Sequence, residues 1–271
     1  MKKYDLSVKL LSIDNIDVIV SNKLVSRIYI EADDFISHKG IKFDFDGEIY
    51  IVFPDVLTTK ALKLIDDNYD YIIAKSQGIL IHNLDSLFYL KDKSYDLSKV
   101  VASERLYAYN SSSIEFYREN GLHNFTYPVE LTFKEGEDIC FGKVEEIVYG
   151  RTALMVSSGC VHKNTTKCDQ IKQNLILKDR KKMDFFVQNR CEYCYNVTYN
   201  SVPTMIMDEL SNIHKDASSV RIDLTFENKD QIKKILDLYE ACCYGNCPAK
   251  EEIRNVIGEY TRGHYHKGMI S

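Results

Sequence analysis

Four of the eight cysteines have the spacing of ligands to a metal ion or metal cluster. They follow the pattern C-x7-C-x22-C-x2-C, at Cys160, Cys168, Cys191 and Cys194. A C-x2-C pair can turn two thiolates toward one ion, and a hairpin between the pairs can bring the first two cysteines alongside. Thiolates in this number suit zinc or an iron–sulfur cluster better than calcium or magnesium. Because zinc usually takes two C-x2-C pairs, the wider first pair favours a cluster, with zinc or ordinary buried thiols as the alternatives.

The other four cysteines carry a weaker signal. Cys242, Cys243 and Cys247 form a C-C-x3-C group at the end of a predicted helix. They could make a second metal site, or they could pack as small apolar side chains under the helix end. Cys140 stands alone in the sequence, and we expect it in the core.

Composition narrows the class of protein. The chain has 271 residues and a net charge of −5, with 45% apolar and 28% charged residues. The negative balance excludes a global basic field that would attract nucleic acid. No stretch approaches the roughly 20 apolar residues that a bilayer requires, and no apolar segment follows the N-terminal lysines as in a signal peptide. We therefore expect a cytoplasmic protein with no membrane partner, in which cysteines stay reduced.

Alternating strands and helices must position these cysteines. In the first 150 residues we predict strands at 27–31, 48–53, 71–74, 78–81, 100–102, 107–110, 124–127 and 146–149. Helices are predicted from Thr58, from Asn83 or Asp85, and over 111–119. This alternation is typical of an α/β fold with a parallel sheet, either open or closed into a barrel.

The pattern changes after Gly150, which suggests three regions. Residues 1–150 form the βα-repeat region, 151–204 a cysteine-rich segment that binds the metal or cluster, and 205–271 further βα units and a tail. The middle segment contains a predicted β-hairpin of strands 175–178 and 184–188. The last region contains predicted helices 205–214, 229–242 and 250–260 and a predicted strand 220–225.

Four ordered motifs in the second half carry a family resemblance. They are EEIVYGRTALMVSSGC at 145–160, LKDRK at 177–181 followed by the C-x2-C pair and YNS at 199–201, VRIDLT at 220–225, and TRGHYHKG at 261–268. Together they resemble the peptidase family U32, the collagenase-like peptidases, over residues 45–271 and most clearly after Val144. Two features depart from the family. Tyr149 stands where its commonest motif has a histidine, and the glycine-rich opening strand of its longer members is missing.

The resemblance implies a fold, and with it a possible partner. It predicts partial TIM-barrel-like βα repeats with a cysteine-rich β-hairpin insertion, in a chain that looks like the C-terminal half of a family member. A partial barrel leaves sheet edges unpaired. A second chain that supplies the missing barrel strands is therefore a possible partner, and a non-catalytic half-barrel subunit is one hypothesis for the function.

The resemblance also implies two kinds of enzyme. Some members of the family are linked to oxygen-independent hydroxylation of a tRNA uridine or a quinone ring, and they hold a 4Fe-4S cluster on four cysteines. Here those positions would be Cys160, Cys168, Cys191 and Cys194. The family name instead suggests a collagenase-like peptidase, but the chain has no G-x-S-x-G or H-E-x-x-H motif. An RNA, a small molecule and a peptide all stay open as the substrate.

The motifs supply four candidate catalytic residues. We expect Glu145 near the C-terminal end of a barrel strand, as a general base or a hydrogen-bond acceptor. Arg151 could bind a carboxylate or phosphate, or pair with a neighbouring glutamate. Arg221 and Asp223 share one face of their strand and serve either catalysis or a buried ion pair. The cationic tail, which holds Arg262, His264, His266 and Lys267, could close over an anionic substrate.

Overall fold

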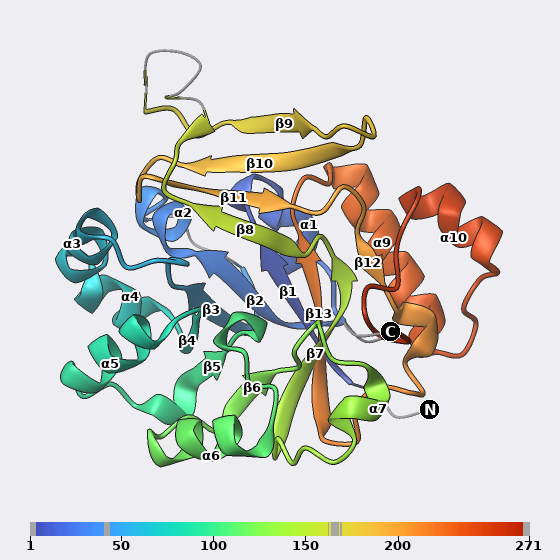
Figure 1. Cartoon of the computed structure of the whole chain (residues 1–271), viewed down its shortest axis with the longest axis horizontal. Coiled ribbons are helices and arrows are strands. Elements are labelled where there is room, and N and C mark those ends of the chain that lie inside the picture. Colours follow the sequence, from blue (N-terminus) through green and yellow to red (C-terminus); the bar gives the residue numbers. More distant parts are fainter. Residues whose placement is uncertain (1–3, 41–43, 162, 164–167, 169, 268–271) are drawn as a thin grey trace.

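The computed structural model describes residues 4–40, 44–161, 163, 168 and 170–267, and its centre is a closed barrel of eight parallel strands (Figure 1). Neighbouring strands pair in the order β1, β2, β3, β4, β5, β6, β7, β13, and β13 pairs with β1 to close the ring. The strands are β1 (Asp5–Leu10), β2 (Val25–Glu31), β3 (Glu48–Val52), β4 (Gly78–Ile81), β5 (Val100–Ala102), β6 (Asn124–Thr126), β7 (Lys143–Gly150) and β13 (Ala217–Leu224). The predicted α/β, TIM-barrel-like fold is confirmed.

The prediction of a partial barrel is wrong. Strand β1 fills the opening position that the family resemblance left empty, so one chain fills all eight strand positions of the ring. The closed ring has no position for strands from a second chain. Strand β1 was not predicted, although its residues alternate in the manner of a strand: Leu6, Val8 and Leu10 pack outward in the apolar core, and Ser7 and Lys9 alternate with them.

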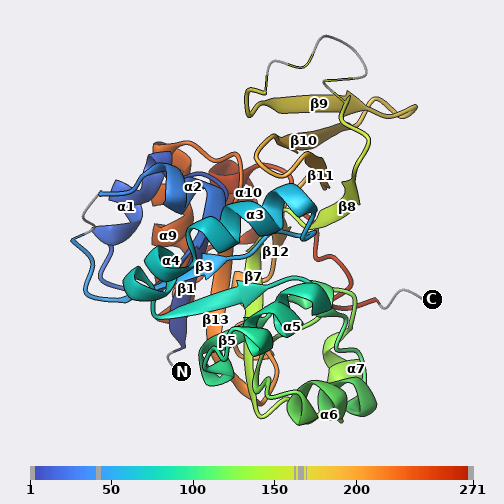
Figure 2. The ribbon, with the colours of Figure 1, turned by 90° about the vertical axis from the view of Figure 1, so that its left-hand side faces the viewer.

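Helices cover the outside of the barrel (Figures 1 and 2). They are α1 (Ile16–Val20), α2 (Ala32–Ser37), α3 (Thr59–Asp67), α4 (Tyr69–Lys75), α5 (Leu84–Asp92), α6 (Ser111–Glu119), α7 (Phe133–Gly136), α9 (Lys229–Cys243) and α10 (Lys250–Ile257). Side-chain caps begin several of them: Thr58 accepts from the Ala61 N–H, Asn83 from Ser86 and Asn110 from Ser113. No helix in the described ranges is long and apolar enough to cross a membrane.

Three predicted elements are wrong. Residues 71–74 lie in α4, because packing of Ile72 in the core overrides the β-propensity of this segment. Residues 107–110 form an irregular segment after a short 3-10 turn that ends at Tyr107 with φ 52°. The predicted helix 205–214 is a two-residue strand, β12 (Thr204–Met205), followed by a 3-10 turn, Met207–Glu209, because β12 pairs with the end of β7.

A second sheet lies across the carboxyl ends of the barrel strands (Figures 1 and 2). It is antiparallel, with strand order β8-β11-β10-β9, and is inserted between β7 and β13. Its strands are β8 (Ala153–Ser157), β9 (Asn174–Lys178), β10 (Asp184–Arg190) and β11 (Tyr195–Tyr199). The predicted hairpin corresponds to β9 and β10, which pair as expected, but it is half of a four-stranded sheet. We call residues 153–199 the insert.

Candidate functional site

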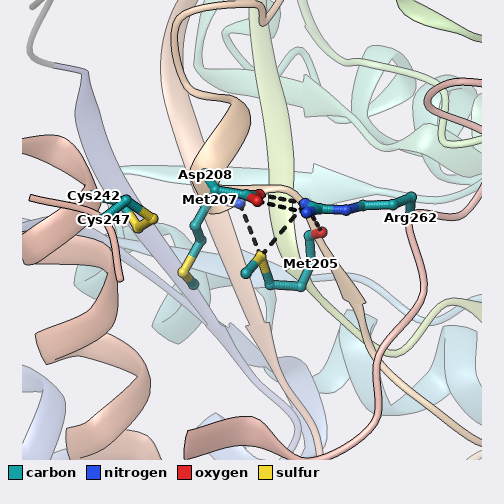
Figure 3. The surroundings of a disulfide bond; sticks show 6 residues. All are labelled: Met205, Met207, Asp208, Cys242, Cys247 and Arg262. Atoms are coloured by element: carbon teal, nitrogen blue, oxygen red, sulfur yellow. Dashed lines mark hydrogen bonds and ion pairs between the residues drawn. A yellow bond between two sulfur atoms is a disulfide. The ribbon is translucent and has the colours of Figure 1, made fainter. Parts of the chain in front are cut away.

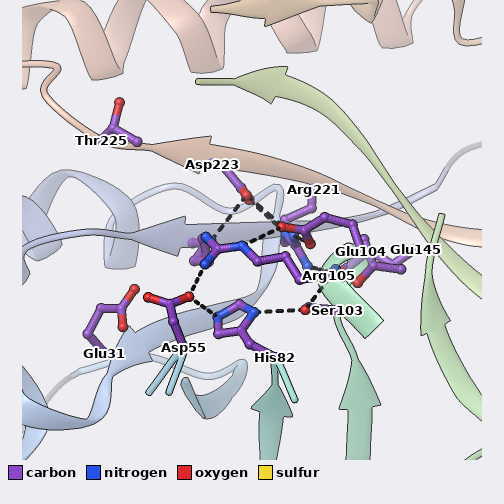
Figure 4. Close-up of polar contacts among 12 residues, drawn as sticks. Glu31, Asp55, His82, Ser103, Glu104, Arg105, Glu145, Arg221, Asp223 and Thr225 are labelled. Carbon is purple, nitrogen blue, oxygen red and sulfur yellow. Dashed lines mark hydrogen bonds and ion pairs between the residues drawn. The ribbon is translucent and has the colours of Figure 1, made fainter. Parts of the chain in front are cut away.

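A buried arginine organises the inside of the barrel (Figure 4). Arg221 lies on β13, where strand alternation turns it inward together with Asp223. Its guanidinium donates to Asp223 Oδ1 at 2.6 Å, to Glu145 Oε2 at 2.9 Å and to Glu104 Oε2 at 3.0 Å. Burial opposes the charged form, but the three carboxylates outweigh it and raise the pKa of Arg221. The structure therefore brings three of the four candidate catalytic residues into one ion-pair network.

Glu145 does not lie where the sequence suggested. It is the third residue of the eight-residue strand β7, so the prediction of a position near the C-terminal end is wrong. Its side chain is 3% exposed and accepts from the Tyr29 hydroxyl at 3.1 Å as well as from Arg221. Glu145 also lines a cavity of about 750 Å³ at the amino-terminal mouth of the barrel, opposite the insert. Its carboxylate is thus an internal partner of Arg221, below the mouth that the insert covers.

Arg151 stands apart from this network. Its Nη1 donates to the carbonyl oxygens of Asn200, at 3.1 Å, and of Ser201, and its guanidinium stacks 4.5 Å from the ring centre of Phe186. It therefore fastens the insert to the barrel and pairs with neither Glu145 nor Glu146. At the carboxyl-terminal mouth, Arg151 lines a cavity of only about 30 Å³ together with Lys9 and Asp223.

Three polar residues that the sequence analysis missed follow successive barrel strands. Asp55, His82 and Ser103 come just after β3, β4 and β5, and carboxyl ends of parallel strands meet at one mouth of a barrel. His82 Nδ1 lies 2.7 Å from Ser103 Oγ, and His82 Nε2 lies 3.9 Å from Asp55 Oδ1 (Figure 4). Burial first, and then the positive charges of Lys9, Arg221 and Arg190, lower the pKa of His82 well below its ordinary value. The signal in the sequence was a polar side chain directly after each predicted strand.

The contact between Ser103, His82 and Asp55 has a structural role and lacks two features of a catalytic triad. Ser103 is 2% exposed and caps a 3-10 turn by accepting from the Arg105 N–H at 3.2 Å. Asp55 is already held by the Arg105 guanidinium and by the Tyr195 hydroxyl at 3.2 Å. A nucleophile needs access to substrate and a base whose pKa lies near the working pH. Ser103 lacks that access, and His82 lacks that pKa.

The four predicted ligand cysteines line a single cavity of about 350 Å³ in the insert. Cys160 follows β8, and Cys191 and Cys194 flank the tight turn between β10 and β11. That turn forms because the Arg190 carbonyl accepts the N–H groups of Tyr193 at 3.0 Å and Cys194 at 2.8 Å, with Cys194 at φ 61°. The folded insert therefore gathers residues that the sequence separates by up to 34 positions.

The residues around this cavity fit a sulfur-ligated group. The Cys160 sulfur accepts a hydrogen bond from the Lys163 backbone N–H at 3.4 Å. At least one of the four sulfur atoms therefore has a backbone hydrogen-bond donor beside it. No three Cys, His, Asp or Glu side chains among the described residues are grouped to hold a metal ion. Four thiols around one cavity are a donor set that suits both zinc and an iron–sulfur cluster.

A disulfide joins two of the three cysteines in the C-C-x3-C group (Figure 3). Cys242, near the end of α9, bonds to Cys247, and Cys243 is a buried free thiol. The expectation that all eight cysteines stay reduced is wrong for this pair, and two of the three possible ligands of a second metal site are used. Cys140 is exposed, so its predicted place in the core is also wrong.

The C-terminal tail packs beside β12. Arg262 binds both carboxylate oxygens of Asp208 and donates to the Met205 carbonyl at 2.9 Å (Figure 3). His266 lies 3.4 Å from Glu209. The side chains of Arg262 and His266 thus face acidic residues of the 3-10 turn after β12.

The resemblance to family U32 depends on the four motifs alone. No protein-family model, no curated protein and no solved structure matches this chain.

Proposed function

We propose that the chain is an iron–sulfur barrel enzyme that carries out oxygen-independent hydroxylation or a similar modification. The observation that supports this most is the single cavity lined by Cys160, Cys168, Cys191 and Cys194, beside the carboxyl-terminal mouth of a TIM-type barrel. These four thiolates would hold a 4Fe-4S cluster, which supplies one-electron redox chemistry when bound. Active sites of TIM barrels lie at this mouth.

The network inside the barrel divides the catalytic candidates into two groups. Asp223 and Lys9 line the small cavity at the carboxyl-terminal mouth, with Lys9 Nζ 3.4 Å from Asp223 Oδ2, so they are the groups that can touch a substrate there. Arg221 and Glu145 lie deeper and hold Asp223 in place. Arg151 lines the same cavity from the insert side. An RNA base or a small ring compound fits the proposed chemistry, and the family resemblance supports both.

A collagenase-like peptidase is the second candidate, and only the Asp55–His82–Ser103 contact favours it. The burial of Ser103 and the low pKa of His82 argue against this function. The closed barrel contradicts the half-barrel part of the third hypothesis, a non-catalytic half-barrel subunit, and a non-catalytic role stays an alternative. We also propose a cytoplasmic location, since six of the eight cysteines are free thiols and an iron–sulfur site on four of them suits a reducing compartment.

Anaerobic purification with assays of iron, sulfide and zinc tests the proposal. We expect about four irons per chain for a full cluster, together with its visible absorption, and loss of both in Cys191→Ala. Cys140→Ala is the matched control, because this thiol is exposed and lies outside the cysteine cavity. One zinc per chain would make the site a structural clamp and favour the peptidase. A chain that binds neither metal after reconstitution would refute the proposed function.

A further inference from the structure

Arg190 lies at the junction between the cysteine cavity and the barrel. It is the last residue of β10, directly precedes Cys191, and lines the cavity with the four cysteines. Its side chain is 2% exposed, so its positive charge is fully buried. A buried guanidinium is costly unless carboxylates compensate its charge and acceptors satisfy its N–H groups.

Carboxylates from the barrel compensate the charge of Arg190. Its Nη2 lies 2.9 Å from Glu31 Oε1, and its Nη1 lies 3.6 Å from Asp33 Oδ1. Glu31 ends β2, and Asp33 lies two residues further along, in α2. Lys172 adds a second positive charge, 3.5 Å from Asp33. Arg190 therefore connects the wall of the cysteine cavity to the end of a barrel strand.

The Nε–H of Arg190 lacks an acceptor. Both Nε and Nη1 are buried and make no hydrogen bond within the described part of the chain, but Nη1 faces Asp33 Oδ1, which also makes none, at 3.6 Å. A buried donor without a partner is costly, and native proteins rarely leave one. Sulfur atoms of a thiolate-bound cluster are acceptors, and hydrogen bonds and charges beside them set its reduction potential.

We infer that Arg190 is a positioning residue whose free Nε–H hydrogen-bonds to sulfur in the cysteine cavity and whose charge raises the reduction potential there. Glu31 and Asp33 hold the guanidinium in place and moderate that charge. The inference rests on the proposed cluster. It adds that the barrel, through the carboxylates at the end of β2, tunes the redox chemistry of the insert.

Two substitutions of opposite sign test this inference. Arg190→Gln removes the positive charge and the Nε–H, so reduction becomes less favourable and the midpoint potential shifts downward. Glu31→Gln removes a negative charge and keeps a side-chain oxygen that can accept from Arg190, so the potential shifts upward. Arg180→Gln is the control, because Arg180 is exposed in the turn between β9 and β10, and its potential should match that of the unchanged protein.

The measurement is a redox titration of anaerobically purified full-length protein, followed by the spectrum of the reduced cluster. Shifts of opposite sign in Arg190→Gln and Glu31→Gln, both larger than in Arg180→Gln, support the inference. Should Arg190→Gln fail to fold, the upward shift in Glu31→Gln decides alone. If Glu31→Gln or Arg190→Gln binds the cluster but has the same midpoint potential as Arg180→Gln, the proposed role of Arg190 is refuted. The proposal of a cluster is not affected by that result. Unchanged protein that carries no iron refutes the proposed function, and this inference with it.

Discussion

Replacing either of two adjacent glutamates on β7 by glutamine should change stability in opposite directions, because Glu145 faces into the barrel and Glu146 faces outward. Glu146 packs on the outer wall, 3% exposed, and accepts a hydrogen bond from the His214 backbone N–H at 2.9 Å. Burial raises the pKa of Glu146 from 4.5 to about 7, although this hydrogen bond acts in the opposite direction. The folded protein therefore binds more protons than the unfolded chain between these two pH values, and its stability falls as pH rises through them.

The size of this loss follows from the shift in pKa. Each pKa unit corresponds to about 1.4 kcal/mol, so the raised pKa of Glu146 lowers the free energy of unfolding by about 3 kcal/mol above pH 8 and by about 1 kcal/mol at pH 5.5. Glu146→Gln keeps an oxygen to accept from His214 and cannot ionise. We expect it to be more stable than the unchanged protein, with a gain that grows by about 2 kcal/mol between pH 5.5 and 8.5.

Urea unfolding followed by circular dichroism, at several pH values, measures this gain. Glu115→Gln, on the exposed side of α6, should show no dependence of its stability difference on pH. Glu145→Gln should be destabilised by about 3–5 kcal/mol, because it takes a charged partner from buried Arg221. A stability difference for Glu146→Gln that stays flat with pH would refute the reasoning, as would similar effects at both glutamates.

Three further substitutions test the interior and the mouth of the barrel. Arg221→Met leaves Glu145, Glu104 and Asp223 without their shared cation and should cost about 3–5 kcal/mol in urea unfolding; a loss below 1 kcal/mol would contradict the network. Ser103→Ala should lose about 1–2 kcal/mol of stability, because the cap of the 3-10 turn is gone. It should also retain any activity of the protein, whereas a serine peptidase would lose nearly all of it. Gly150→Ala should cost about 1–3 kcal/mol, since Gly150 has φ 147° and an added Cβ would lie 2.6 Å from Asp223 Cβ; unchanged stability would show that this strand end can relax.

Much of the fold could be predicted from local pattern. Strands such as 48–52 and 78–81 combine a short apolar run with turn residues at their ends, and the helix that follows Thr58 has both a cap and an apolar face. The closure of the ring could not be predicted this way. Closure depends on β1 pairing with β13, more than 200 residues later in the chain, and no local pattern encodes that contact. The family resemblance even favoured a partial barrel, because the glycine-rich opening strand of the longer members is missing here.

The candidate site also divides into features that local sequence predicts and features that depend on long-range contacts. Spacing was enough to single out the four cysteines, because the turn that joins Cys191 to Cys194 is local. Strand alternation placed Arg221 and Asp223 on one face. Spacing could not reveal that Glu145 lies low in the barrel, that Arg105 neutralises Asp55, or that Arg190 reaches Glu31. Each of these facts depends on the register between strands or on how the insert packs over the mouth.

The polarity of the barrel interior is itself an argument for function. TIM barrels are usually filled by layers of bulky branched side chains. Here the apolar residues inside form one small cluster, Tyr29, Tyr50, Val52, Leu80 and Val101. Above it lie Arg221 with its three carboxylates and, under the insert, Arg190 with two more. Well-packed apolar residues often stabilise a core as much as buried ion pairs, or more. Stability alone therefore gives little reason for two buried guanidiniums between the centre of the barrel and the cysteine cavity. The redox chemistry proposed above gives one, because it needs charged groups held in position at this mouth.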